Sequence, residues 1–142
     1  IEQELQRRAE ASHAVFLVRS IPGVGVRTAE AVVAFLDDPH RFPNAKSVGQ
    51  YFGLVPRQDQ SGNKNRMGHI SHEGPSVVRQ LVAEAAWQAC RRSPTVHAYF
   101  ERVQRGDPQR KKTALVATAH YLVRVMYALL KNGTLWKETA TA

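Results

Sequence analysis

The sequence predicts an all-α fold. Apolar residues recur at the three- and four-residue spacing of an α-helix in several stretches. Clusters of glycine, proline and aspartate separate those stretches. The chain has 142 residues and 43% hydrophobic residues, which suits one hydrophobic core and is short for two. We therefore treat residues 1–142 as a single domain.

The N-terminal part contains three expected helices. Residues 2–19 and 26–37 each carry apolar side chains at helical spacing. Asp38-Pro39 ends the second helix, because the residue before a proline disfavours the helical conformation. Asn44 suits the N-cap of a third, short helix.

The C-terminal part contains three more expected helices. Pro75 fits the first turn of one helix, and Ser93 is a cap followed by a first-turn proline. A turn at residues 106–108 precedes the last helix. That helix runs from about 109 to 131, until Gly133 stops it.

Residues 57–74 form a long connection without helical periodicity, ahead of a helical remainder at 75–132. The connection contains three glycines, and Met67 and Ile70 are its apolar residues. Connections of this length in compact domains are commonly functional or disordered. A short β-hairpin turning at Gly62 is the alternative.

The net charge of +8 and the sequence pI of about 10.2 favour a polyanionic partner. Residues 1–56 hold six Lys/Arg and six Asp/Glu, so their charges cancel. Residues 57–131 hold thirteen Lys/Arg against five Asp/Glu and supply the whole excess. Charge confined to one part of the chain favours a binding face over a general solubility role.

Part of that charge lies at expected helix ends, in a group that we call the basic strip: Arg91, Arg92, Arg102, Arg105, Arg110, Lys111 and Lys112. The strip is either a solvated surface or a track for phosphates, whose affinity would fall steeply with salt. We expect the aromatic residues of this half, tryptophans included, to pack in the core.

Several classes of protein are excluded. The single cysteine, Cys90, allows neither an internal disulfide nor a cysteine-based zinc site. His69 and His72 have a metal-like spacing, but no acidic or cysteine cluster accompanies them, so we expect no metal site here. We expect no signal peptide and no membrane span, and hence a cytoplasmic, prokaryotic nucleoid-associated location. Because the chain does not begin with Met, we expect it to be part of a longer protein.

Residues 14–37 resemble a helix-hairpin-helix, a module that contacts the DNA backbone. The turn Ile21-Pro22 is followed by Gly23, Val24 and Gly25 at the N-terminus of the next helix. Glycines allow tight turns and close approach of a phosphate, and free N–H groups at a helix N-terminus favour anions. Arg27 and Thr28 would add side-chain contacts. The alternative is a plain turn between two helices.

Four further elements follow in a fixed order: Gly53-Leu54-Val55-Pro56-Arg57, Ser61-Gly62-Asn63-Lys64, Arg66-Met67-Gly68-His69-Ile70-Ser71-His72-Glu73-Gly74 and Val78-Arg79. With the glycine turn, they resemble the serine-bearing C-terminal domain of insertion-sequence transposases that also contain a RuvC-like DEDD nuclease domain. Piv-type DNA invertases belong to the same group. The resemblance covers residues 14–103. His72 stands where the family pattern favours lysine.

The resemblance implies that Ser61 is the nucleophile of DNA strand exchange through a phosphoserine intermediate. Arg57, Lys64 and Arg66 would stabilise the charge of the transition state. Ser71 and Arg79 would contact the DNA backbone, with Ser71 as the competing candidate nucleophile. No general base for Ser61 is evident.

The same resemblance implies partners that this chain does not contain. They are DNA, with a guide RNA as a second candidate, and a DEDD nuclease domain in the same full-length chain. We expect no cofactor in this fragment and a divalent metal in the missing nuclease domain. The intact protein is expected to be a homo-oligomer, and the fragment alone to be inactive.

Two alternatives remain. The chain is a non-catalytic helix-hairpin-helix module of a repair or recombination protein, or a helical domain whose basic face meets an acidic protein.

Overall fold

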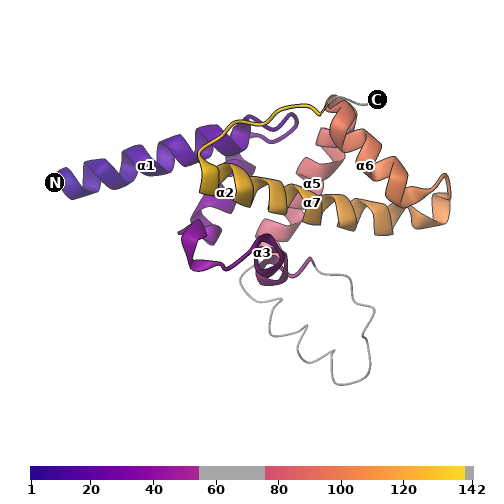
Figure 1. Cartoon of the computed structure of the whole chain (residues 1–142), viewed down its shortest axis with the longest axis horizontal. Helices are drawn as coiled ribbons and strands as arrows, with labels where there is room; N and C mark the ends of the chain where they lie inside the picture. Colours follow the sequence, from indigo (N-terminus) through magenta and orange to yellow (C-terminus); the bar gives the residue numbers. More distant parts are fainter. Residues whose placement is uncertain (55–75, 140–142) are drawn as a thin grey trace, which may run out of the picture.

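The computed structural model describes residues 1–54 and 76–139. In those ranges every regular element is a helix, which confirms the predicted all-α fold. The elements are shown in Figure 1: α1 (Glu2–Arg19), α2 (Val26–Leu36), the 3₁₀ turn η1 (Pro39–Arg41), α3 (Ala45–Phe52), α5 (Ser76–Arg92), α6 (Pro94–Gln104), the 3₁₀ turn η2 (Pro108–Arg110) and α7 (Lys111–Asn132).

Helix α7 is the centre of the core. It packs against α1, α3, α5 and α6. Leu122, Val123 and Met126 of α7 are completely buried. The stretch Pro108–Asn132 has the length and apolar composition of a membrane span, as core helices also do. Its buried face accounts for its apolar character, since four helices cover it.

The structure confirms the helix caps that the sequence predicts. The Asn44 side chain accepts a hydrogen bond from the Ser47 N–H at 2.9 Å, and α3 follows. Ser93 Oγ accepts from the Val96 N–H at 3.1 Å. Gly133 ends α7 in the left-handed conformation, with φ of 68°. These interactions join residues within three or four positions, so sequence alone identifies them.

The two 3₁₀ turns were not expected. Each begins with a proline behind a capping aspartate, at Asp38 and Asp107. The Asp38 side chain accepts from the His40 N–H at 2.9 Å, and that of Asp107 from the Gln109 N–H at 3.0 Å. The turns set the direction in which the chain enters α3 and α7.

Helix α1 extends away from the other helices at its N-terminal end (Figure 1). Only Leu17 and Val18, at its C-terminal end, are buried. Leu5 and Phe16 are both 60% exposed, although they lie on the helix's apolar side. The core therefore begins at the last turn of α1.

The segment after α7 crosses the molecule in extended form, which the sequence did not indicate. The Trp136 N–H donates to Ser20 Oγ at 2.8 Å. Glu138 accepts from Ser93 Oγ at 2.8 Å and from the Thr95 N–H at 3.0 Å. This segment thus connects the turn after α1 with the N-terminus of α6. The predicted connection at 57–74, with the alternative hairpin at Gly62, lies outside the described residues.

Candidate nucleic-acid interface

The glycine turn between α1 and α2 packs directly on α5. Gly23 has φ of +93°, and a Cβ atom there would lie 2.6 Å from the backbone nitrogen of Ala89. No real Cβ tolerates that distance. The Val24 N–H closes the turn by donating to the Ile21 carbonyl at 3.1 Å. Gly23 is therefore required by the approach of the turn to α5.

The remaining hairpin residues divide into buried and exposed ones. Val24 is 6% and Thr28 9% exposed, so both side chains serve mainly in packing. Gly25 is the exposed N-cap of α2, with no atom within 4 Å of a Cβ placed on it. Arg27 is exposed in the first turn. The positive end of the α2 dipole is thus open to solvent at Gly25 and Arg27.

Arg79 lies against the C-terminal end of α3. Its guanidinium passes Gly53, where a Cβ would lie 2.9 Å from the Arg79 Nη1. Gly53 has φ of +75° and caps α3. Leu54 and Ser76 are the described residues that border segment 55–75. Arg79 therefore places a cation beside Gly53, two residues before the segment that contains Ser61.

His120 of α7 approaches α3 one turn before Gly53. A Cβ at Gly49 would lie 2.0 Å from the His120 Nε2, so only glycine leaves room for the imidazole. Burial, together with the charge of Arg124, lowers the pKa of His120. Nε2 has no hydrogen-bond partner among the described residues. Sequence reasoning missed this residue, because its environment comes from α3.

The predicted site residues do not form one cluster in the described structure. The hairpin touches α5 at Gln88 and Ala89, whereas Arg79 lies in the first turn of the same helix. Arg79 and Gln88 are nine positions apart on this helix, a rise of about 14 Å. The other predicted site residues lie outside the described residues: Arg57, Ser61, Lys64, Arg66 and Ser71.

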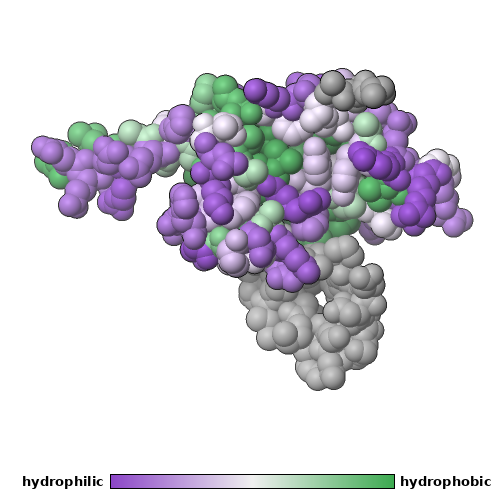
Figure 2. Space-filling view, in the orientation of Figure 1, coloured by the Kyte–Doolittle hydropathy of each residue, from purple (hydrophilic) through white to green (hydrophobic). Residues whose placement is uncertain are grey.

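The basic strip lies on the surface, at the ends of α5 and α6 and the start of α7. Arg110 is half-buried and donates to the Val103 carbonyl at 3.0 Å, so it fixes the turn before α7. The other six side chains are exposed, and within the described ranges none forms a salt bridge. Figure 2 shows hydrophilic side chains at the end of the molecule where α6 meets α7.

Trp87 is the functional candidate that sequence reasoning missed. We expected it in the core, but it is half-buried and lines two surface hollows. Lys111 Nζ lies 4.8 Å and the Arg91 guanidinium 5.8 Å from its ring centroid. The sequence does indicate that Trp87 lies near the surface. Glu84 lies three residues before it and Arg91 four residues after it. These spacings place the tryptophan on the polar face of α5.

Comparison with protein families identifies the group to which the sequence belongs. The model of the transposase IS116/IS110/IS902 family matches residues 16–101, more than half of the chain. The chain is a member of this transposase family. The match lies within residues 14–103, over which we recognised the motifs, and it includes both the glycine turn and the segment with Ser61.

Individual relatives agree with this assignment. The chain is 28% identical over its whole length to the insertion element IS110 uncharacterized 43.6 kDa protein of Streptomyces coelicolor, covering 35% of that protein. It is 41% identical over 60% of its length to the transposase for insertion sequence element IS1111A of Coxiella burnetii, covering 23% of it. It is 27% identical over 87% of its length to the pilin gene-inverting protein of Moraxella bovis, covering 39%. The chain thus spans well under half of these relatives.

Proposed function

We propose that this chain is the DNA-binding, serine-supplying part of a transposase or site-specific recombinase, and that Ser61 is its nucleophile. The family match carries the proposal, because it includes the segment with the Ser-Gly-Asn-Lys element. Relatives named as transposases and as a pilin gene-inverting protein support DNA as the substrate.

In the proposed reaction the Ser61 Oγ attacks a scissile phosphate. An Oγ–P bond forms as the hydroxyl gives up its proton, and the bond from phosphorus to a sugar oxygen breaks. That oxygen takes up a proton and leaves as a hydroxyl, so the exchange consumes no net proton. The phosphoserine retains the bond energy, so the reverse attack by another sugar hydroxyl joins new strands. A serine hydroxyl is a weak nucleophile, so the negative charge on the pentacoordinate phosphorus must be stabilised in the transition state, for which Arg57, Lys64 and Arg66 are the candidates.

The residues proposed to contact the DNA backbone are described residues that are exposed or lie near segment 55–75. Gly25 and Arg27 offer an N–H group and a guanidinium at the open end of α2. Arg79 lies beside Gly53, two residues before that segment. The basic strip adds positive charge. Such contacts hold a duplex without reading its sequence, so target choice would come from a guide RNA or from another domain.

The test of the nucleophile is Ser61→Ala in the full-length protein that contains this chain. We expect recombination of a plasmid substrate to fall below detection, and the covalent protein–DNA adduct to disappear, while duplex binding stays within about twofold of the unchanged protein. The isolated chain is expected to bind DNA without joining strands.

Ser71→Ala is the matched control, because it removes the same hydroxyl ten residues later. Recombination should persist in this variant, at a reduced level if Ser71 contacts a phosphate. Undiminished recombination by Ser61→Ala would contradict the nucleophile and leave the non-catalytic DNA-binding module as the function.

A salt titration with short duplex DNA separates both DNA-binding functions from a protein-interaction domain. The logarithm of the affinity should fall steeply and linearly with the logarithm of the salt concentration, because phosphate contacts release counterions. Absence of binding even at about 50 mM salt would favour an acidic protein partner.

A further inference from the structure

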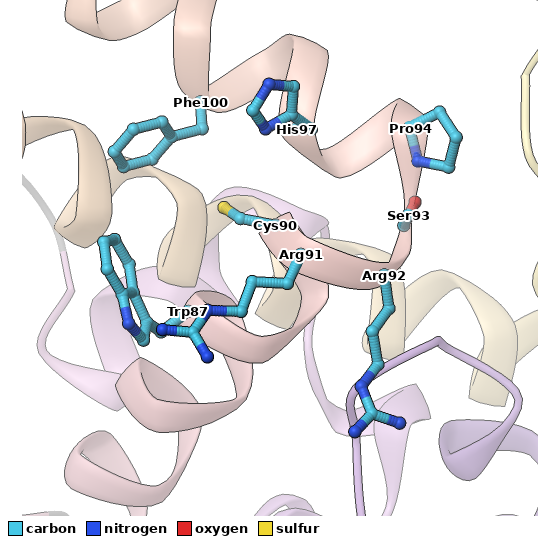
Figure 3. A pocket seen from close by; sticks show the side chains of 8 residues that line it. All are labelled: Trp87, Cys90, Arg91, Arg92, Ser93, Pro94, His97 and Phe100. Atoms are coloured by element: carbon cyan, nitrogen blue, oxygen red, sulfur yellow. The ribbon is translucent and has the colours of Figure 1, made fainter.

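The surface around Trp87 has a form that neither the sequence motifs nor the family assignment explains. A groove of about 680 Å³ runs between the end of α5 and α6 (Figure 3). Trp87, Cys90 and Phe100 form its apolar part, and Arg91 and His97 stand at its edge. Its volume lies within the range of small-ligand sites, about 300 to 1,000 Å³.

A second hollow of about 570 Å³ lies on the α7 side of the same tryptophan. Lys111 and Leu115 of α7 line it together with Trp87. Cations therefore accompany Trp87 in both hollows, Arg91 and Arg92 in the first and Lys111 in the second. Trp87 is held in place by Phe100, whose ring meets it edge-on at a centroid distance of 6.1 Å.

The charges around the groove favour an anionic occupant. Of the described residues, no carboxylate lines the first groove, while Arg91 and Arg92 are both exposed there. Burial raises the pKa of the Cys90 thiol to about 11, so the thiol adds no negative charge. Two carboxylates meet residues at the rim of the groove: Glu101 lies 3.3 Å from His97, and Glu138 accepts a hydrogen bond from Ser93. A third, Glu84, lines the second hollow with Lys111. Arg91 and Arg92 of the first groove form no salt bridge with a described carboxylate.

We propose that this groove binds an unpaired nucleotide of a single-stranded nucleic acid. The base stacks on the indole of Trp87, and the flanking phosphates are held by Arg91, Arg92 and Lys111. An accessible aromatic ring beside exposed cations is an arrangement by which proteins hold single strands, because every base has a π-face and every nucleotide a phosphate. The Arg91 guanidinium leaves the ring for the adjacent phosphate as the base enters.

An apolar protein segment is the other conceivable occupant, and the charges argue against it. A groove for such a segment gains little from two exposed arginines and a lysine at its edge, since these cations remain solvated. A nucleotide uses both the apolar floor and the cations. The inference rests on nucleic-acid binding by this chain and is independent of Ser61.

The test uses intrinsic fluorescence of the 142-residue chain carrying Trp136→Phe, so that Trp87 is the remaining tryptophan. Eight-nucleotide (dT) and (rU) strands serve as the DNA and RNA probes, with a duplex of equal length and an amphipathic helical peptide beside them. We expect saturable quenching by one or both single strands and none by the duplex, whose bases are already paired and stacked. Preference between the two strands identifies the source of the nucleotide.

The matched affinity measurement compares Trp87→Leu with Trp136→Phe, by anisotropy of labelled strands. Trp87→Leu should weaken single-strand binding by about 5- to 150-fold, the cost of one base–aromatic stack, and Trp136→Phe should bind like the unchanged chain. If Trp87→Leu fails to fold by circular dichroism, the quenching experiment decides alone.

The inference fails if single strands bind without quenching Trp87, if folded Trp87→Leu binds them unchanged, or if only the peptide quenches. Duplex binding that persists in any of these cases leaves the proposed function standing while removing this site.

Discussion

The glycine turn after α1 and the groove at Trp87 both contact α5 near its C-terminal end. They differ in whether a sequence motif marks them as a binding site. The turn has a motif typical of phosphate binding, yet Gly23 contacts the backbone of Ala89 and Val24 is buried. The groove has no motif, yet a half-buried indole lies there beside three exposed cations.

The difference teaches that a glycine pattern has two physical causes that sequence does not separate. A missing Cβ admits either a phosphate or another helix, because both require close approach to the backbone. At Gly23 the space is filled by α5, whereas at Gly25 it is open. Gly25 and Arg27, two positions later, are exposed at the start of α2.

The largest effect is expected from Gly23→Ala. The added Cβ would lie 2.6 Å from the Ala89 nitrogen. The alanine would also have to adopt the φ of +93° that Gly23 has. Overpacking and the unfavourable backbone conformation together should cost about 2 to 5 kcal/mol in free energy of unfolding. Urea denaturation of the isolated chain measures it.

Gly25→Ala is the control, since nothing lies within 4 Å and its φ is −87°. It should cost about 1 kcal/mol or less, the difference between glycine and alanine at an N-cap. Equal stability losses in both variants would show that the turn does not pack on α5 as described.

An effect of intermediate size is expected on the salt dependence of binding. It distinguishes the groove, with its proposed single strand, from the glycine turn, with its proposed duplex. Replacing Arg91 and Lys111 together by glutamine should lower the salt dependence of single-strand binding by about 1.4 logarithmic units, for two lost phosphate contacts. Arg27→Gln should leave that slope unchanged and lower the slope for duplex DNA by about 0.9. Anisotropy titrations over a range of salt concentrations test this; the reverse pattern would assign the duplex to the groove and the single strand to the hairpin.

The smallest effect concerns the C-terminal segment, which joins the turn at Ser20 to the groove's edge at Ser93. Partial burial by itself raises the pKa of Glu138, but hydrogen bonds from Thr95, Trp136 and Ser93 outweigh it and lower the pKa to about 2. The charged form therefore stabilises the fold above the unfolded value of 4.5, and this stabilisation is lost as the pH falls from 4.5 towards 2.

Glu138→Gln should accordingly lower the Tm slightly at pH 7, and its difference from the unchanged chain should shrink as the pH falls below 4.5. The expected cost at pH 7 is about 1 kcal/mol or less, since a solvent-exposed cap is screened. Thermal scans from pH 2 to 7 measure it. A difference that stays constant with pH would show that the carboxylate does not hold the start of α6.

The sequence by itself determined the helices, their caps at Asn44, Ser93 and Gly133, and the family to which the motifs belong. These features depend on residues a few positions apart, because helical periodicity and capping hydrogen bonds act over that distance in the sequence. The charge excess of the C-terminal half was equally plain from composition.

Only the tertiary structure decides which glycine is free, that Trp87 lines two surface hollows and where the chain's last segment lies. Gly23 meets Ala89 across 66 residues, and Trp136 meets Ser20 across 116. Whether an indole on α5 is covered depends on where α6 and α7 pass it, and that follows from the packing of the whole core around α7. Long-range packing sets burial, and burial separates a residue that stabilises the fold from one that meets a ligand.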